Sequence, residues 1–239
     1  MHLFDLTLPT PQENLALDEA LLEHAEASDP PCEMLRIWES RETFVVLGRS
    51  SQAALEANLE FCRRQGICVL RRTSGGAAVV VAPGALMYAV VLSYEVRPAL
   101  HSLDEAHRFV LQTTLAALAP LMPQATHQGI CDLTLGEQKF SGNSVRCKQR
   151  SLLYHGTLLY GMDLSLVEQY LQMPSRQPDY RRNRPHGSFI TNAPADAAAL
   201  RRALIAGWRA TPAPFDWPRQ RVRQLVLERY HRDEWNLQR

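Results

Sequence analysis

Two stretches of the sequence combine charged donors with glycine turns. The first, residues 71–81, places Arg71 and Arg72 before a Thr-Ser-Gly-Gly turn that separates two apolar, β-prone segments. Adjacent glycines allow positive φ and let the backbone approach a ligand closely, and arginine supplies planar, permanently charged donors suited to carboxylate or phosphate. A β-hairpin with an exposed basic turn is the alternative, which these residues alone favour because Gly-Gly turns are common.

The second stretch runs from Asp132 to Ser144 and resumes at residues 155–157, His-Gly-Thr. Lys139 follows a turn and precedes a phenylalanine and a Ser-Gly pair. In such a partly apolar setting a lysine can pair with an anionic ligand or stabilise developing negative charge. An isolated lysine is more often a surface residue, and His155 alone is more often a packed core histidine. His155 and Gly156 interrupt an apolar segment, residues 152–160, that is typical of a strand. A glycine inside a strand indicates a bulge or a close backbone approach.

The elements that must position these residues are strands and helices in an order that is not strictly alternating. This order predicts an α+β fold with helices on a largely antiparallel or mixed sheet, in one domain over residues 1–239. Ser102 with Glu105, and Ser165 with Glu168, are typical of helix starts with a capping box. The predicted helices cover residues 12–27, 53–65, 102–121, 165–173, 196–210 and 218–230, and the predicted strands cover 3–8, 34–38, 43–47, 68–70, 78–81, 86–94 and several segments between 132 and 160.

Composition narrows the class of protein. Apolar residues make up 46% of the chain, charged residues 21%, and the net charge is +1, so neither nucleic acid nor an anionic membrane is indicated as a partner. We find no apolar run long enough to span a bilayer and no signal peptide. Five cysteines without a Cys-x-x-Cys pair favour reduced thiols in a cytoplasmic protein over disulfides or a metal site.

In this order the motifs resemble the catalytic domain shared by lipoate-protein ligases, biotin-protein ligases and octanoyltransferases, and most closely the lipoate-protein ligase A branch. The family's Arg-Arg-x-Ser-Gly-Gly-Gly-Ala-Val loop is matched by residues 71–79, with Ala77 at the third glycine. Its Asp and Lys-x-Ser-Gly are matched by Asp132 and residues 139–142, and its His-Gly-Thr-Leu-Leu by residues 155–159. The resemblance implies a class II synthetase-like fold.

The resemblance also implies an activity. Such ligases use ATP to convert lipoate or octanoate into an acyl-adenylate, and then transfer the acyl group to a lysine of a lipoyl-acceptor domain. Acceptors of this kind are the glycine-cleavage H protein and the E2 subunits of 2-oxoacid dehydrogenases. Mg²⁺ is expected with ATP, and its ligands are not identified. Lys139 is the implied catalytic residue, and the implied substrate-binding and adenylate-binding residues are Arg71, Arg72, Ser74, Gly75, Gly76, Ala77, Asp132, Ser141, Gly142, His155, Gly156 and Thr157.

Two departures from the family pattern leave alternatives open. Polar residues that usually follow the loop are replaced by residues 81–85, Val-Ala-Pro-Gly-Ala, and the C-terminal accessory domain of longer ligases is expected to be absent. A separate subunit would then supply that domain, or the protein does not adenylate. The second case is an ATP-independent transferase that moves octanoate or lipoate between carrier proteins, and a third is a non-catalytic binder of acyl groups or lipoyl domains.

Cys131 is the candidate nucleophile for the transferase alternative. One group of such transferases has its cysteine several residues before the strand that carries the lysine. Cys131 is close to that position, but it directly precedes Asp132 and is therefore offset from it. Another group has its cysteine in a Pro-Cys-Gly motif after the His-Gly strand. That motif is absent here, since Ser175 follows Pro174. A small pocket-lining thiol is the favoured interpretation of Cys131, because free cysteines usually behave as buried apolar residues. The basic loop 174–185 is either a solvated connection or a docking segment for an acidic acceptor.

Overall fold

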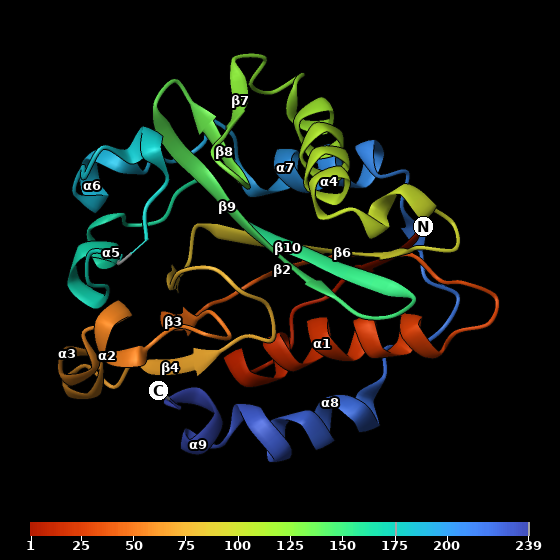
Figure 1. The fold of residues 1–239 in the computed structure, drawn as a ribbon, viewed down its shortest axis with the longest axis horizontal. Coiled ribbons are helices and arrows are strands. Elements are labelled where there is room, and N and C mark those ends of the chain that lie inside the picture. The colour runs from red at the N-terminus through yellow and green to blue at the C-terminus, as the bar shows by residue number, and fades with distance from the viewer. Residues whose placement is uncertain (175, 239) are drawn as a thin grey trace.

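An eight-stranded mixed sheet forms the centre of the protein in the computed structural model, which describes residues 1–174 and 176–238 (Figure 1). The strand order is β11-β1-β2-β6-β10-β9-β8-β7. β1 pairs in parallel with both of its neighbours, and the other pairs are antiparallel. The strands are β1 (His2–Asp5), β2 (Met34–Glu39), β6 (Ala85–Ser93), β7 (Ala125–Gln128), β8 (Asp132–Leu135), β9 (Gln138–Cys147), β10 (Ser151–Leu159) and β11 (Thr211–Pro212).

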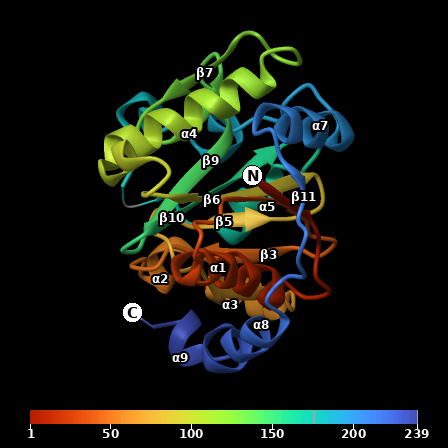
Figure 2. The same cartoon turned by 90° about the vertical axis from the view of Figure 1, so that its right-hand side faces the viewer.

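Helices α4 and α7 cover one face of this sheet, and α1 covers the other, with α8 packed against α1 (Figure 2). Successive side chains of a strand point to these opposite faces. On β6, Tyr88 and Val90 belong to the core under α4 and α7, whereas Ala89 and Val91 belong to the core under α1 and α8. Leu153 of β10 also packs in the core under α1, so the same alternation turns His155 towards that helix. The helices are α1 (Pro11–Ala27), α4 (Leu103–Leu118), α7 (Ala197–Gly207) and α8 (Arg219–Leu225).

A smaller sheet, ordered β4-β3-β5, carries the glycine loop. β4 (Cys68–Arg71) and β5 (Val79–Val81) both pair with β3 (Phe44–Leu47), one in parallel and the other antiparallel. The β-hairpin alternative is therefore wrong: β3 lies between the two strands, and residues 72–78 cross its end. Short helices pack under this sheet in a third apolar core. They are α2 (Ala53–Glu56), α3 (Leu59–Arg64), α5 (Ser165–Tyr170) and α6 (His186–Phe189).

The α+β fold with a mixed sheet is confirmed, but several helix predictions need correction. The predicted helix 53–65 is two helices, because Ala57 pairs with Leu171 in a β-bridge and the Asn58 side chain starts a new helix by accepting from the Phe61 amide. Neither predicted capping box forms. The last predicted helix continues beyond α8 as a π-helical turn, η3 (Val226–Tyr230), and then α9 (Asp233–Asn236), while 3₁₀ turns occur at η1 (Pro98–His101) and η2 (Asp179–Arg181).

Across the described residues, no helix is both long enough and apolar enough to cross a bilayer. The longest, α1, has 17 residues and carries buried polar side chains. Three of these, Asn14, Asp18 and Glu19, are nearly inaccessible to solvent. Buried polar groups of this kind require partners: Glu19 pairs with Arg229 and accepts from the Tyr230 hydroxyl, whereas Asp18 pairs with Arg36 and borders the candidate site.

Candidate active site

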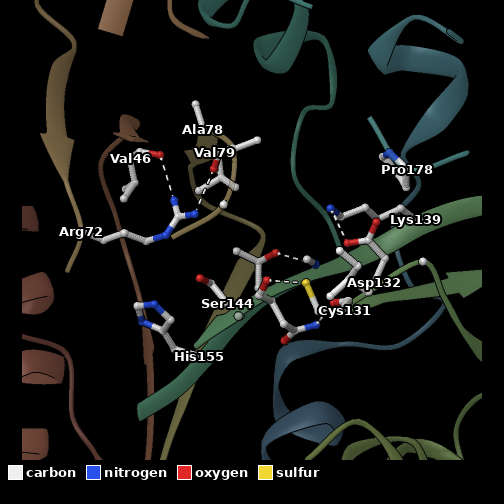
Figure 3. A pocket seen from close by; sticks show the side chains of 18 of the residues that line it. Val46, Arg72, Ala78, Val79, Cys131, Asp132, Lys139, Ser144, His155 and Pro178 are labelled. Atoms are coloured by element: carbon white, nitrogen blue, oxygen red, sulfur yellow. Dashed lines mark hydrogen bonds and ion pairs between the residues drawn. The ribbon is translucent and has the colours of Figure 1, made fainter. Parts of the chain in front are cut away.

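A cavity of about 730 Å³ lies between the glycine loop, strands β9 and β10, and residues 176–180. Its apolar wall includes Leu15, Val46, Val79 and Met87. Figure 3 shows its polar groups on two sides, with Arg72 and His155 on one and Lys139 and Asp132 on the other. An apolar pocket with a few convergent polar groups is typical of a small-molecule site. The predicted site residues that line it are Arg72, Gly76, Ala77, Cys131, Asp132, Lys139, Gly142, His155, Gly156 and Thr157.

The Arg72 guanidinium organises the glycine loop. It is buried, its Nε donates to Ser74 Oγ at 3.1 Å, and its Nη atoms donate to the carbonyls of Val46, Gly75 and Ala77. Burial lowers the pKa of Arg72 to about 10, so it remains charged at neutral pH. Among the described residues it has no carboxylate within ion-pair distance. A buried charge held only by neutral dipoles favours an anionic ligand.

The glycine loop presents its backbone amides as donors. Gly76 has φ +88, and a Cβ on Gly48 would lie 1.8 Å from the Gly76 carbonyl oxygen, so both positions require glycine. No described acceptor binds the amides of Gly75, Gly76 or Ala77. Successive free amides in such a turn form an anion-binding concavity. Ala77 is not among the residues with positive φ, so the loop accommodates alanine at the family's third glycine position.

Lys139 is held across the start of two strands. Its Nζ lies 2.7 Å from Asp132 Oδ1, and the other oxygen of this carboxylate accepts from the Tyr180 hydroxyl at 2.8 Å. A Cβ on Gly142 would lie 2.7 Å from both Lys139 Cε and Nζ. The lysine side chain therefore lies over the glycine three residues later, which gives the Lys-x-Ser-Gly spacing a physical reason. Ser141 borders a smaller adjoining cavity of about 140 Å³ that also contacts Lys139.

His155 belongs to a buried chain of polar side chains. Its Nε2 lies 2.5 Å from Ser74 Oγ, and its Nδ1 lies 3.4 Å from Asp18 Oδ2. Asp18 Oδ1 accepts from Arg36 at 2.5 Å. Ser74 and Gly75 do not line the cavity themselves, but Gly75 accepts from Ser144 on β9 at 2.8 Å and so ties the loop to the sheet.

Arg71 does not line the cavity, in contrast to the sequence prediction. Although adjacent to Arg72, its guanidinium points the other way, because neighbouring residues of an extended chain face opposite sides. It is fully buried, and it donates to the carbonyls of Gly48 at 2.7 Å, Ser51 at 2.8 Å, Trp235 at 3.0 Å and Gln238 at 2.7 Å. Arg71 thus joins the loop after β3 to the segment at α9.

Replacing Arg71 by methionine is expected to lower the free energy of unfolding by at least about 3 kcal/mol, because several buried carbonyls lose a charged donor. The measurement is urea denaturation together with limited proteolysis near Arg232. Arg223 is exposed on α8, so Arg223→Met is the matched control and should stay within about 0.5 kcal/mol of the parent. Equal denaturation midpoints for the two variants would refute this role for Arg71.

Cys131 lines the cavity with a protonated thiol. Its Sγ donates to the Asn143 carbonyl at 2.8 Å. Burial raises the pKa of Cys131, Asp132 raises it further, and Lys139 and Arg72 only partly offset this. Since the thiolate is the nucleophilic form, this environment leaves the free thiol weakly reactive at neutral pH.

Several residues at the site were not identified from the sequence. Ser144 could have been found, because it follows Gly142 by two residues on one strand and therefore shares its face. Neither Asp18 nor Tyr180 was singled out, since only the tertiary fold brings α1 and the basic loop to β9 and β10. Arg146, further along β9, has a buried Nε without a partner in the described part of the chain.

The basic loop 174–185 lies partly outside the described residues, at Ser175, and its residues 176–180 line the cavity.

The residues that the structure describes do not form a metal site of their own. Within the described residues, no group of three His, Cys, Asp or Glu side chains could hold an ion. The carboxylate nearest to Lys139, that of Asp132, is already engaged by the lysine and Tyr180. Mg²⁺ commonly binds through one or two carboxylates and the phosphates of its nucleotide. An ion that enters with ATP would therefore be held largely by the phosphates.

Comparison with known proteins agrees with this arrangement. The family model for the lipoyl protein ligase A/B catalytic domain matches residues 10–194. A putative lipoate-protein ligase A from Aeropyrum pernix is 32% identical over 160 residues, which are 67% of this chain and 58% of that protein. The octanoyltransferase LipM of Brevibacillus brevis is 25% identical over an alignment of 267 residues that covers 96% of each. The chain thus spans about half the length of the curated lipoate-protein ligases it matches, and nearly all of LipM.

Two solved structures share the fold. One is a lipoate-protein ligase A bound with ATP, at 22% identity and a TM-score of 0.85, covering 99% of this chain and 98% of that chain. The other comes from a structural analysis of a bipartite lipoate protein ligase and its E2 lipoyl domain from Thermoplasma acidophilum, at 23% identity and a TM-score of 0.83, covering 100% and 97%. At these identities the likeness establishes the fold.

Proposed function

The chain belongs to the lipoyl protein ligase A/B catalytic domain family, and on this premise we propose that it attaches lipoate or octanoate to a lysine of a lipoyl-acceptor domain through an acyl-adenylate. The observation that carries the proposal is the cavity itself: an apolar wall suited to an acyl chain lies between two cationic groups, Arg72 and Lys139. The ATP-bound structure of the same fold supports the use of a nucleotide.

The reaction places negative charge on phosphate and carboxylate oxygens. The substrate carboxylate attacks the α-phosphate of ATP, pyrophosphate leaves, and the acceptor lysine then attacks the activated carbonyl and expels AMP. Lys139 would stabilise charge on the carboxylate and α-phosphate oxygens, and the amides of Gly76 and Ala77, which line the cavity, would donate to the anion. Preorganised donors of this kind need little rearrangement during the reaction and are worth several kcal/mol in a water-excluded site. Mg²⁺, expected with ATP, would supply charge neutralisation at the phosphates.

The acceptor we propose is a lipoyl domain of an E2 subunit or the glycine-cleavage H protein, in the cytoplasm. The Thermoplasma study, which pairs a bipartite ligase with its E2 lipoyl domain, supports this class of acceptor and a separate accessory subunit for adenylation. The single-domain organisation over residues 1–239 and the roles of the site residues remain predictions.

A second candidate function is the ATP-independent transfer of octanoate or lipoate between carrier proteins. It is favoured by Cys131, whose thiol lies in the same cavity as Lys139, and by the match to LipM along almost its whole length. The raised pKa of the Cys131 thiol, caused first by burial and then by Asp132, counts against it. The ligase is therefore our main proposal.

Intact mass spectrometry of an acceptor domain separates the two functions. One reaction contains the protein, lipoate, ATP and Mg²⁺, and the other contains the protein, an octanoylated carrier and no ATP. Acylation only in the first supports the ligase, and acylation only in the second supports the transferase. No acylation in either reaction would contradict both functions for the protein alone and favour a missing subunit or the non-catalytic binder.

Replacing Cys131 by serine sharpens this distinction. Serine keeps a donor for the Asn143 carbonyl, so the ligase should retain its initial rate within about threefold, since such replacements usually change stability only modestly. A transferase that forms a thioester on Cys131 should lose about 10³-fold or more, because the alcohol is a far weaker nucleophile than the thiolate. Initial rates in the two reactions provide the measurement. Loss of ATP-dependent acylation in this variant would contradict the ligase mechanism as proposed.

A further inference from the structure

Five side chains from four parts of the fold form one continuous polar chain, which we call the buried relay: Arg36, Asp18, His155, Ser74 and Arg72. It starts on β2, passes through α1 and β10, and ends in the glycine loop. The successive distances are 2.5 Å from Arg36 Nη1 to Asp18 Oδ1, 3.4 Å from Asp18 Oδ2 to His155 Nδ1, 2.5 Å from His155 Nε2 to Ser74 Oγ, and 3.1 Å from Ser74 Oγ to Arg72 Nε. All five residues are at most 9% exposed.

The two ends of the buried relay dictate its proton arrangement. Arg36 and Arg72 can only donate. Burial would raise the pKa of Asp18, but Arg36 and His155 outweigh it and the pKa is lowered, so the carboxylate is ionised and only accepts. In its neutral form, His155 then donates from Nδ1 to Asp18 and accepts at Nε2 from the Ser74 hydroxyl, whose oxygen accepts from Arg72. In this arrangement every group of the relay has a partner.

The sequence of groups Asp, His and Ser resembles a catalytic triad, but the serine is not placed as a nucleophile. Ser74 is 1% exposed, it is absent from the cavity lining, and its oxygen already accepts from Arg72. The member of the relay beyond Ser74 is Arg72, which does line the cavity and which holds the carbonyls of Gly75 and Ala77. The relay therefore ends at the anion-binding loop.

We propose that Asp18 is a positioning residue: by fixing the His155 tautomer it holds Ser74, and through Ser74 it fixes the Arg72 guanidinium and the glycine loop for an anionic substrate group. The anion, a carboxylate or a phosphate, rests on the proposed function, whereas the arrangement of the relay does not. Arg36 serves this role by anchoring Asp18. Its guanidinium also donates to the backbone carbonyls of Leu6 and Asn14, which hold Arg36 in place.

Asp18→Asn tests the relay with little change in shape. Arg36 requires an acceptor, so the asparagine oxygen would face Arg36 and its NH₂ would face His155. His155 would then accept at Nδ1 and carry its proton on Nε2. We expect ¹⁵N NMR of histidine-labelled protein to show a proton on Nδ1 of His155 in the parent and on Nε2 in Asp18→Asn, with the His155 signal assigned from His155→Gln.

The kinetic consequence is a loss of substrate positioning. Asp18→Asn should lower kcat/KM for ATP-dependent acylation about 10²-fold, the cost of a small misplacement of a binding group. Ser74→Ala should cause a similar loss while leaving the proton on Nδ1. The double variant should be no worse than the more affected single variant, because both changes interrupt one relay. If Asp18→Asn does not fold, the loss and the retained tautomer in Ser74→Ala decide the question.

Asn14→Ala is the matched control. It also removes a buried contact of Arg36, but it leaves the bonds from Asp18 to His155 and Ser74 intact. It should lower the melting temperature while keeping the Nδ1 proton and kcat/KM within about threefold of the parent. A proton that stays on Nδ1 in Asp18→Asn, or full additivity with Ser74→Ala, would overturn the proposal. If the parent acylates no acceptor, the proposed function fails, and the tautomer measurement still decides the relay.

Discussion

Lys139→Ala is expected to reduce acyl transfer about 10²–10³-fold while leaving the fold intact, because it removes the cation that stabilises charge developing on the carboxylate and phosphate oxygens. The side chain is about a quarter exposed, at 26%, and faces the cavity rather than a core, so its loss should change stability little. Its removal also leaves the Asp132 carboxylate with the Tyr180 hydroxyl as its one side-chain partner among the described residues, which adds an unpaired negative charge beside an anionic substrate. Initial rates of acceptor acylation, followed by intact mass, provide the measurement.

The chain offers a matched control, because its sequence contains two lysines, Lys139 and Lys148. Lys148 lies 3.6 Å from Glu23 on the surface, and Lys148→Ala should keep the parental rate. The double variant Lys139→Ala/Asp132→Asn separates two causes: it removes the bare carboxylate without restoring the cation. If the double variant recovers the parental rate, the role of Lys139 is to neutralise Asp132 and not to stabilise the reacting anion.

The order of the motifs was sufficient to predict the fold class, and most of the predicted site residues line the cavity. Strand positions were predictable because buried central strands such as β6 and β10 are continuous apolar runs. The glycine within β10 was interpreted as a bulge or a close backbone approach, and the structure shows the close approach. The cavity roles of Arg72 and Lys139 stay predictions, but the structure brings both to one cavity from segments about 65 residues apart in the sequence.

What could not be predicted depends on packing between distant segments. Residue type alone does not distinguish Arg71 from Arg72; the strand turns one towards the C-terminal segment and the other towards the cavity. The break at Ala57 in the predicted helix 53–65 depends on a bridge to Leu171. The capping box predicted at Ser102 fails although the spacing is correct, because the Ser102 amide donates to the Ala99 carbonyl and the Glu105 carboxylate pairs with Arg108.

Gly156→Ala should lower the free energy of unfolding by about 3 kcal/mol or more. A Cβ at this position would lie 1.9 Å from Asn143 Oδ1 and 2.8 Å from the Gly142 carbonyl oxygen. The asparagine cannot withdraw easily, because its side chain accepts from the Tyr88 hydroxyl and donates to the Cys131 carbonyl and Ser141. Urea denaturation provides the measurement.

The same steric overlap should also lower the catalytic activity. β9 carries both Asn143 and Lys139, so a shift of this strand away from the new methyl group would displace the lysine and lower kcat/KM about 10²-fold even where the variant is folded.

Gly161→Ala is the control, since nothing lies within 4 Å of a Cβ there, and it should be neutral or slightly stabilising. Adding Asn143→Ala to Gly156→Ala should restore part of the stability, because it removes the side-chain overlap and leaves the contact with the Gly142 carbonyl. If Gly156→Ala and Gly161→Ala unfold at the same urea concentration, the close approach between β9 and β10 is not what requires glycine at position 156.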